Sequence, residues 1–79
     1  MYLSELKVGE FATIKALNVE ESIRRRLLDI GMIPGTKVEC VMNSPFKGNS
    51  AYFIRGSLIA IRDLDAKKVI VECDLPNER

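Results

Sequence analysis

The segment Arg24–Gly35 (RRRLLDIGMIPG) constrains the fold most strongly, because it ends an amphipathic helix and enters a tight turn within a few residues. Gly31 follows the last helical position and can adopt the left-handed conformation that closes a helix C-terminus. Pro34 forbids further helix, and Pro34 followed by Gly35 suits a type II turn, whose third residue has a positive φ. The sequence therefore predicts a helix, a stop and a turn in direct succession.

The helix is predicted to begin at Val19, with Asn18 as its N-cap and Glu21 at the capping-box position. At about 100° per residue, its apolar residues fall on one stripe. The stripe consists of Val19, Ile23, Leu27 and Ile30. Because the rest of the chain is rich in short strand-like segments, we expect this stripe to pack on a small sheet or barrel.

Five short segments have the alternation or composition of β-strands, and turn-forming residues separate them. They are residues 11–17, 37–43, 51–55, 58–62 and 69–73. We expect their inward faces to carry Ala12, Ile14, Ala16, Val38, Cys40, Met42, Tyr52, Ile54, Ile59, Ile61, Val69, Val71 and Cys73. Residues 63–68 are polar enough for a turn, and residues 4–6 suit one helical turn that buries Leu3 and Leu6.

This pattern predicts a mainly β fold: a small SH3-like five-stranded barrel with one α-helix inserted after the first strand. An OB-fold is the main alternative, but its helix normally falls between the third and fourth strands. We expect residues 1–75 to form a single domain and residues 76–79 to be a frayed tail. A chain of 79 residues buries only about 60% of its unfolded surface, so its stability is modest and a partner could add to it.

Charge and hydropathy narrow the class of protein further. The net charge is +1, which gives no bulk attraction to nucleic acid or to an anionic membrane. No apolar run approaches the ~18 to 20 residues of a membrane span, and the first residues lack a signal-peptide core. We therefore expect a cytoplasmic protein without direct membrane insertion.

The chain has little of the chemistry that catalysis or metal binding requires. It has no His, no nucleophile elbow and no glycine-rich phosphate loop, so we do not expect an enzyme. Its two cysteines, Cys40 and Cys73, fall on the inward faces of their strands and are expected to be reduced core thiols. A closed zinc site needs four N or S ligands, so we expect no metal site and no cofactor.

Three consecutive arginines, Arg24 to Arg26, share the helix with three acidic residues. Two of the arginines lie four residues after Glu20 and Glu21, an order that favours ion pairs of about 0.2–0.5 kcal/mol each. Leu28 projects away from the apolar stripe, beside Arg24, and is expected to be exposed. An exposed leucine among arginines is one candidate docking surface, and a solvated, self-paired helix face is the alternative.

A second candidate surface lies on the strands around Gly56-Ser57. If Arg55 and Arg62 point outward, parity places three apolar residues on the same outer face. They are Phe53, Leu58 and Ala60. A two-residue turn at Gly56-Ser57 would place Phe53 opposite Ala60 and Arg55 opposite Leu58.

Phe46, from the loop before these strands, would extend this outer face. Aromatic side chains rimmed by arginine have the composition of a hot spot in a protein interface. The alternative is that the N-terminal segment or the helix covers Phe53 and Leu58, which would make a two-sided core.

Four stretches of the chain carry a family resemblance: LSELKVGE (3–10), RRRLLDIGMIPGTKVE (24–39), SPFKGNSAYFIRGSLIAIR (44–62) and AKKVIVE (66–72). The positions that match the family motif are Arg26, Leu27, Gly31, Pro34, Gly35, Thr36, Arg55, Gly56, Ala60 and Arg62. On these residues the chain resembles the FeoA family of small bacterial ferrous iron transport proteins. The resemblance implies an SH3-like barrel and a cytosolic accessory of the large membrane ferrous iron transporter FeoB, whose cytoplasmic part is a GTP-binding domain.

The role implied by the resemblance is protein–protein contact with the cytoplasmic domain of FeoB, which supports or regulates Fe²⁺ uptake. The contact residues we expect are Arg24, Leu28, Phe46, Phe53, Arg55 and Leu58, on a surface shaped by Gly31, Pro34, Gly35 and Gly56. One alternative is a metal-responsive module related to the C-terminal module of iron-dependent repressors. Another is a nucleic-acid-binding barrel that uses the arginine run, although we expect no nucleic acid partner. An apolar outer patch could also support a weak homo-oligomer.

Overall fold

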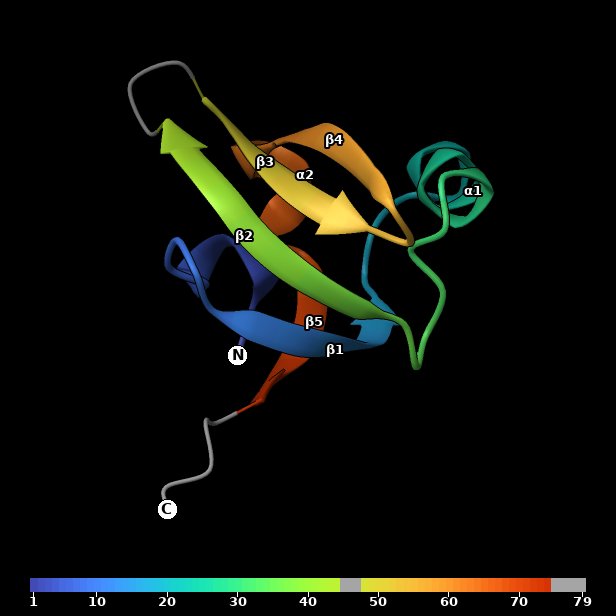
Figure 1. Cartoon of the computed structure of the whole chain (residues 1–79). Coiled ribbons are helices and arrows are strands. Elements are labelled where there is room, and N and C mark those ends of the chain that lie inside the picture. The colour runs from blue at the N-terminus through green and yellow to red at the C-terminus, as the bar shows by residue number, and fades with distance from the viewer. Residues whose placement is uncertain (45–47, 75–79) are drawn as a thin grey trace.

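The structure, a computed structural model, describes residues 1–44 and 48–74 (Figure 1). Its elements in chain order are η1 (a 3-10 turn, Leu3–Glu5), β1 (Phe11–Leu17), α1 (Glu21–Asp29), β2 (Lys37–Ser44), β3 (Asn49–Ile54), β4 (Ser57–Arg62), α2 (Asp63–Ala66) and β5 (Val69–Asp74). The five strands form one antiparallel sheet in the order β4-β3-β2-β1-β5. The predicted fold class is confirmed: a mainly β, SH3-like five-stranded fold with its longer helix after the first strand.

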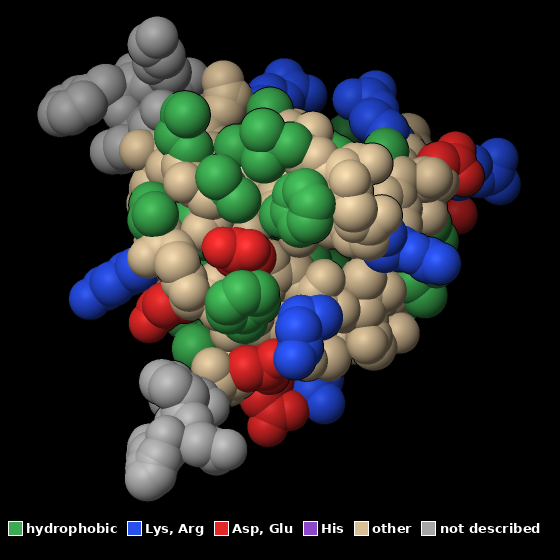
Figure 2. Space-filling model, viewed as in Figure 1, with side chains coloured by type: hydrophobic (Ala, Val, Ile, Leu, Met, Phe, Trp, Pro, Cys, Tyr) green, Lys and Arg blue, Asp and Glu red, His purple; other side chains and the backbone are tan. Residues whose placement is uncertain are grey.

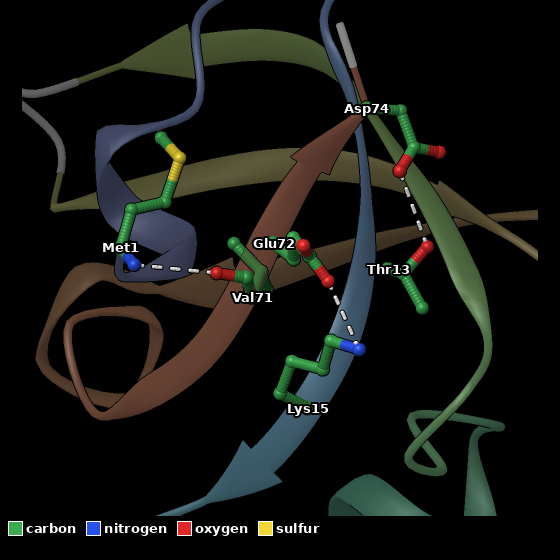
Figure 3. Close-up of polar contacts among 6 residues, drawn as sticks. All are labelled: Met1, Thr13, Lys15, Val71, Glu72 and Asp74. Carbon is green, nitrogen blue, oxygen red and sulfur yellow. Dashed lines mark hydrogen bonds and ion pairs between the residues drawn. The ribbon is translucent and has the colours of Figure 1, made fainter.

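Short segments close the gap between the two edge strands of the sheet. α2 packs against β4 and against η1, and η1 packs against β5. The N-terminal residue pairs with the outer edge of β5. The Met1 ammonium donates to the Val71 carbonyl at 3.3 Å (Figure 3), and the Val71 N–H donates to the Met1 carbonyl at 2.8 Å. Tyr2 adds an antiparallel bridge to Ile70. The edge of β5 is therefore covered, whereas β4 forms the other edge of the sheet.

Side chains also join β1 to β5 on the outer surface (Figure 3). Lys15 Nζ lies 3.0 Å from Glu72 Oε1, and the Thr13 hydroxyl donates to Asp74 Oδ1 at 3.3 Å. Both side chains of the Lys15–Glu72 ion pair are more than half exposed, so it adds less than about 1 kcal/mol. The pairing of these strands therefore rests mainly on their backbone ladder and on the buried face beneath it.

The core lies between the curled sheet and the helical segments. Its buried apolar residues are Leu3, Leu6, Ala12, Ile14, Leu17, Leu27, Met32, Val38, Cys40, Tyr52, Ile54, Ile61, Ala66, Val69 and Val71. Five further residues of the expected set pack on this core partly buried: Val19, Ile23, Ile30, Ile59 and Cys73. The predicted helix stripe and the predicted burial of Leu3 and Leu6 are confirmed.

Helix α1 begins later than predicted. Its N-cap is Glu20, which makes no side-chain capping bond, and the first helical residue is Glu21. The Asn18 N–H instead donates to the Lys68 carbonyl at 2.9 Å, so Asn18 continues the sheet rather than capping the helix. The prediction of a start at Val19 is wrong because a backbone bond between distant segments takes precedence over the local capping signal.

The end of α1 is as predicted. Gly31 has a φ of +102°, its N–H donates to the Leu28 carbonyl at 3.0 Å, and the Met32 N–H donates to the Leu27 carbonyl at 2.9 Å. This is the bond pattern of a Schellman motif. It directs the chain into the core, where Met32 is fully buried.

The turn that follows is also as predicted. Gly35 has a φ of +97°, and the Thr36 N–H donates to the Ile33 carbonyl at 2.9 Å across Pro34-Gly35. The Gly35 N–H donates to the Ile14 carbonyl at 2.8 Å, and the Ile14 N–H donates to the Thr36 carbonyl at 2.9 Å. These bonds fix the turn against β1.

Two β-bulges overturn the predicted orientation of two residues. Against β5, the register of β1 shifts between Ile14 and Ala16, so Leu17 is buried and Ala16 is only half-buried. Against β3, the register of β2 shifts between Cys40 and Met42, and Met42 is 56% exposed. The strict alternation that placed Ala16 and Met42 inside fails because a bulge inserts one residue and reverses the parity beyond it.

The β3–β4 hairpin turns at Arg55-Gly56, not at Gly56-Ser57. Ile54 pairs with Ser57 and Phe53 pairs with Leu58, so the predicted pairing of Phe53 with Ala60 is wrong. Both turn residues have positive φ, 51° and 85°, as in the type I′ turns that match the twist of the strands. The observed register of the hairpin differs from the predicted register by two residues. Because side chains alternate with a period of two, the predicted inner and outer faces of β3 and β4 are unchanged.

The segment 63–68, predicted as a turn, contains the short helix α2. The Asp63 N–H donates to the Gly48 carbonyl at 2.8 Å, and Ala66 is fully buried. A four-residue helix has too few positions to show an apolar period, so its polar composition favours a turn instead.

Candidate protein-interaction surfaces

The outer face of the sheet carries a row of residues that cross-strand pairing brings together. Phe11 on β1 pairs with Glu39 on β2, Glu39 pairs with Phe53 on β3, and Phe53 pairs with Leu58 on β4. Phe11, Phe53 and Leu58 are 43%, 44% and 61% exposed. These four residues are called the sheet face below. Neither the N-terminal segment nor α1 covers it, so Phe53 and Leu58 are not part of a two-sided core.

Figure 2 shows hydrophobic side chains gathered over β2 and β3, with acidic and basic side chains among and around them. Within the sheet face, a shallow hollow of about 190 Å³ is lined by Phe11, Lys37, Val38, Glu39, Phe53 and Arg55. Lys37 is paired with Asp74 at 3.2 Å. Two separated aromatic rings with a carboxylate between them and cations beside them suit an apolar partner with basic and acidic flanks.

Arg55 lies at the end of the sheet face and reaches the end of helix α1. It is the one non-glycine residue with a positive φ in the described part of the chain, at 51°. A Cβ atom placed on Gly31 would come within 2.8 Å of Arg55 Cδ, so the arginine stem packs directly on the glycine. The hairpin turn and the helix terminus therefore meet at Gly31 and Arg55, residues that lie 24 positions apart in sequence.

Arg24 and Leu28 belong to a different surface, called the helix groove. This groove of about 460 Å³ is lined by Lys15, Ala16, Leu17, Asn18, Arg24, Leu28 and Pro34. Leu28 is 37% exposed, as predicted. The contact residues predicted from sequence thus separate into two surfaces: Phe53, Arg55 and Leu58 at the sheet face, and Arg24 and Leu28 at the helix groove. Phe46 lies outside the described residues.

The arginines of α1 are not neutralised as predicted. The ion pairs of the described residues are Lys15–Glu72, Lys37–Asp74 and Arg62–Asp65, and none involves Arg24, Arg25 or Arg26. Glu20 precedes the helix as its N-cap, which removes it from the i,i+4 geometry that its predicted pair with Arg24 assumed. Glu21 and Arg25 both lie in α1, but their exposed side chains form no ion pair in the described part of the chain. Three exposed cations therefore face solvent on this helix.

Phe11 is the residue of the sheet face that the sequence analysis missed. Its strand was predicted with the correct bounds and with Ala12, Ile14 and Ala16 inward; the same parity places Phe11 outward. What the sequence does not supply is the strand order, and without it nothing indicates that Phe11 lies two strands from Phe53.

The described residues hold no group of three or more His, Cys, Asp or Glu side chains that could bind a metal ion. Cys40 is fully buried, and burial raises the pKa of its thiol, with smaller contributions from the charges of Glu10 and Glu39. Cys73 is half-buried against the core. Both cysteines are free thiols.

Among the described segments, no helix has the length and apolar character needed to span a bilayer. The longer helix, α1, has nine residues and three consecutive arginines. The five-stranded antiparallel sheet and the position of α1 define the class of the chain: a small SH3-like β-barrel domain with a helix inserted after its first strand.

Comparison with known proteins then gives the family. Residues 1–73 match the FeoA domain, and the chain belongs to the FeoA domain family. This confirms the resemblance drawn from the sequence motifs and links the chain to iron transport.

Three relatives illustrate the match. Over 72 residues the chain is 32% identical to a Fe(2+) transport protein A/Fe(2+) transporter FeoB fusion protein of Porphyromonas gingivalis (strain ATCC BAA-308 / W83), covering 91% of this chain but only 8% of that relative. The solution structure of the FeoA protein from Chlorobium tepidum is 31% identical, with a TM-score of 0.90 over 99% of this chain and 74% of that one. Stenotrophomonas maltophilia FeoA complexed with zinc, described as an SH3 domain protein, is 29% identical, with a TM-score of 0.79 over 91% of this chain and 89% of that one.

Proposed function

We propose that this chain is a non-catalytic interaction module that contacts the cytoplasmic GTP-binding part of the ferrous iron transporter FeoB. The observation that carries the proposal is the fusion relative, in which a sequence like this one and a FeoB transporter form a single polypeptide. Fusion holds two domains at a high effective concentration, which is useful when the separate domains also act together. On this proposal the chain works at the cytoplasmic side of the membrane.

The sheet face is the proposed primary contact. It presents two aromatic rings and a leucine on three different strands, so its shape is fixed by the sheet rather than by a loop. Rigid aromatic anchors cost little conformational entropy when a partner covers them. Arg55 stands at the border of this face and adds a cation whose stem is held against Gly31.

The helix groove is the second proposed contact. Leu28 provides an apolar anchor, and Arg24 and its unpaired neighbours provide positive charge. Phe46 remains a predicted contact. A partner that spans both surfaces would have to reach around the end of α1 where Gly31 and Arg55 meet.

The proposal is tested by NMR titration of the isotope-labelled chain with the GTP-binding domain of FeoB, with and without nucleotide. Shifts centred on Phe11, Phe53 and Leu58 support the sheet face, and shifts centred on Arg24 and Leu28 support the helix groove. Absence of shifts in every nucleotide state would contradict a direct contact with this domain.

Two variants make the test specific. Phe53→Asp should abolish binding without unfolding the chain, because Phe53 is 44% exposed on the outer face. Leu64→Asp is the matched control: Leu64 is 63% exposed but lies on α2, away from the sheet face, so binding should be unchanged. If Phe53→Asp binds as well as the unmodified chain, the sheet face is not the contact; Leu28→Asp then tests the helix groove.

A metal-responsive role is the second candidate, favoured by the zinc complex of the Stenotrophomonas maltophilia relative. In this chain, the described residues offer no cluster of three ligands, so a metal would have to be shared with a partner or bind weakly. Isothermal titration with Fe²⁺ under anaerobic conditions separates the two functions. A flat titration removes the metal-responsive role and leaves the interaction module.

A further inference from the structure

The two edge strands of the sheet, β5 and β4, differ in whether another segment covers them. Met1 and Tyr2 cover the outer edge of β5, whereas no described strand pairs with β4 on the side away from β3. An uncovered edge offers unpaired N–H and C=O groups to any extended chain of the right length. Proteins normally protect such an edge, so its exposure here requires an explanation.

Hairpin geometry identifies which backbone groups are free. In the β3–β4 turn, the Ile54–Ser57 pair closes the loop and is hydrogen-bonded. Hydrogen-bonded and non-hydrogen-bonded pairs then alternate along the ladder. Ser57, Ile59 and Ile61 therefore bond to β3, whereas Leu58 and Ala60 direct their N–H and C=O groups away from β3.

A groove runs between this edge and helix α1. It has a volume of about 200 Å³ and is lined by Arg26, Leu27, Ile30, Ile59, Ala60, Ile61, Arg62 and Asp65. Its floor is apolar, formed by side chains of the helix stripe and of the inner face of β4. Its rim carries two arginines and one carboxylate.

The charges on the rim favour an acidic occupant. Arg26 forms no ion pair among the described residues, and Arg62 Nε lies 3.9 Å from Asp65 Oδ2, at the limit of an ion pair. Arg62 is also 65% exposed. A carboxylate in the groove would therefore meet one unpaired and one weakly paired guanidinium. The same charges oppose pairing of this edge with β4 of a second copy, because that would bring like charges together.

We propose that the edge of β4 is a binding site for an extended segment of a partner protein, which adds to the sheet as a sixth strand. The segment carries short apolar side chains toward the groove and carboxylates near Arg26 and Arg62. This is β-strand addition, in which main-chain bonds provide affinity and alternate side chains provide specificity. The site shares Leu58 with the sheet face but uses other groups of it: its recognition groups are the backbone of Leu58 and Ala60 and the side chains beside α1, whereas the sheet face presents the Leu58 side chain.

The probe is the synthetic peptide Glu-Val-Thr-Val-Thr-Glu, acetylated and amidated, titrated into the isotope-labelled full chain at millimolar concentration. The expected result is a set of amide shifts at residues 58–62 and at Arg26 and Ile30, with slower hydrogen exchange at the Ala60 amide. A peptide with N-methylated central residues cannot donate to the edge, and a peptide with lysine in place of glutamate has the wrong charge. Equal binding of either control peptide, or no binding of the probe, overturns the proposal.

Variants on the protein side test the same bonds. Ala60→Pro removes the outward N–H without removing a bond to β3, and proline is tolerated where an edge amide faces solvent. Ala60→Pro should abolish peptide binding, whereas the amide chemical shifts of the core residues Ile14 and Tyr52 should be unchanged. If Ala60→Pro disrupts the fold, the double variant Arg26→Glu/Arg62→Glu is used in its place. This double variant should bind the lysine peptide roughly tenfold more tightly than the glutamate peptide.

Arg25→Glu is the matched control for charge, since Arg25 lies on the same helix but does not line the groove. The Arg25→Glu variant should bind the acidic peptide as tightly as the unmodified chain does. If it loses as much affinity as the Arg26→Glu/Arg62→Glu variant, general attraction to the helix explains binding, and the proposed site is overturned. Protection of the Ala60 amide that rises with protein concentration in the absence of peptide would identify a second copy as the occupant and would also overturn it. Phe53→Asp should bind the peptide normally, which separates this site from the proposed contact with the transporter.

Discussion

Gly31 and Arg55 form the contact that joins the helix terminus to the β3–β4 hairpin. An added Cβ on Gly31 would lie 2.8 Å from Arg55 Cδ and 3.6 Å from Ile54 Cγ2. Gly31 also has a φ of +102°, a conformation that residues with a Cβ adopt only with strain. The glycine is thus required twice, for the turn of its own backbone and for the approach of the arginine stem.

We predict that Gly31→Ala destabilises the chain more than Gly35→Ala. Both residues have similar positive φ values, so both substitutions carry a backbone cost of about 1–2 kcal/mol. Only Gly31 has a neighbour in the way, because nothing lies within 4 Å of a Cβ placed on Gly35. Urea unfolding gives the two free energies. Adding Arg55→Ala to each variant should reduce the difference between them; if the difference is unaffected, the Arg55 stem does not restrict residue 31.

We predict that Arg55→Asn stabilises the fold. Arg55 has a φ of 51° at the first position of a type I′ turn, where Asn followed by Gly is the preferred pair. Relief of the left-handed strain should raise the free energy of unfolding by roughly 0.5–1 kcal/mol. Binding to the transporter domain should weaken in the same variant, because a cation at the border of the sheet face is lost. Strain that lowers stability and supports binding is typical of functional positions.

Arg55→Lys separates strain from charge. Lysine keeps a cation and has no special tolerance of positive φ, so the stability should remain close to that of the unmodified chain. Thermal unfolding at matched protein concentration compares the variants. A stabilisation of Arg55→Lys equal to that of Arg55→Asn would show that loss of the guanidinium, not relief of the backbone, is responsible.

The sequence predicts much of this fold because several local signals agree with it. The helix stripe, the stop at Gly31 and the turn at Pro34-Gly35 each depend on residues that are near one another in the chain, and all are confirmed. Ala16 and Met42 are misplaced because a bulge is set by the register of the neighbouring strand. Asn18 is misassigned because its partner, the Lys68 carbonyl, lies fifty residues away.

The candidate surfaces show the same division between local and distant information. The exposure of Leu28, Phe53 and Leu58 follows from periodicity within one helix or one hairpin. The inclusion of Phe11 depends on the pairing of β1 with β2 and of β2 with β3, and the groove beside β4 depends on where α1 packs. Neither relationship leaves a pattern in a single stretch of sequence.

Tyr52 should make the stability fall at alkaline pH. Burial raises its pKa to about 12, although a hydrogen bond with Ser50 acts in the opposite direction. In the unfolded chain the phenol ionises near pH 10, so between about pH 10 and pH 12 only the folded state keeps the proton. The stability that the buried Tyr52 phenol contributes is therefore complete below pH 10. Between about pH 10 and pH 12 the free energy of unfolding falls by about 1.4 kcal/mol per pH unit.

Tyr52→Phe is the comparison that isolates this effect. The Tyr52 hydroxyl donates to the Leu3 carbonyl at 3.4 Å, so its removal should cost about 1 kcal/mol at pH 8. Above pH 10 the unmodified chain loses stability that the variant retains, and the order of the two should reverse. Urea unfolding from pH 8 to pH 11.5 under reducing conditions measures the free energy of unfolding of both proteins. If the difference between the two free energies stays constant with pH, the burial of the phenol is contradicted.

The two thiols should react at very different rates. Cys40 has no exposed surface and a raised pKa, and both properties suppress the thiolate that attacks a disulfide reagent. Cys73 is half-buried on β5 and is the accessible thiol. At pH 8, an aromatic disulfide reagent should modify one thiol rapidly in the native chain and the second only as urea unfolds it. Cys73→Ser should remove the rapid phase; a rapid phase that persists in this variant would place Cys40 within reach of solvent and would contradict the packing of the β2–β3 pair.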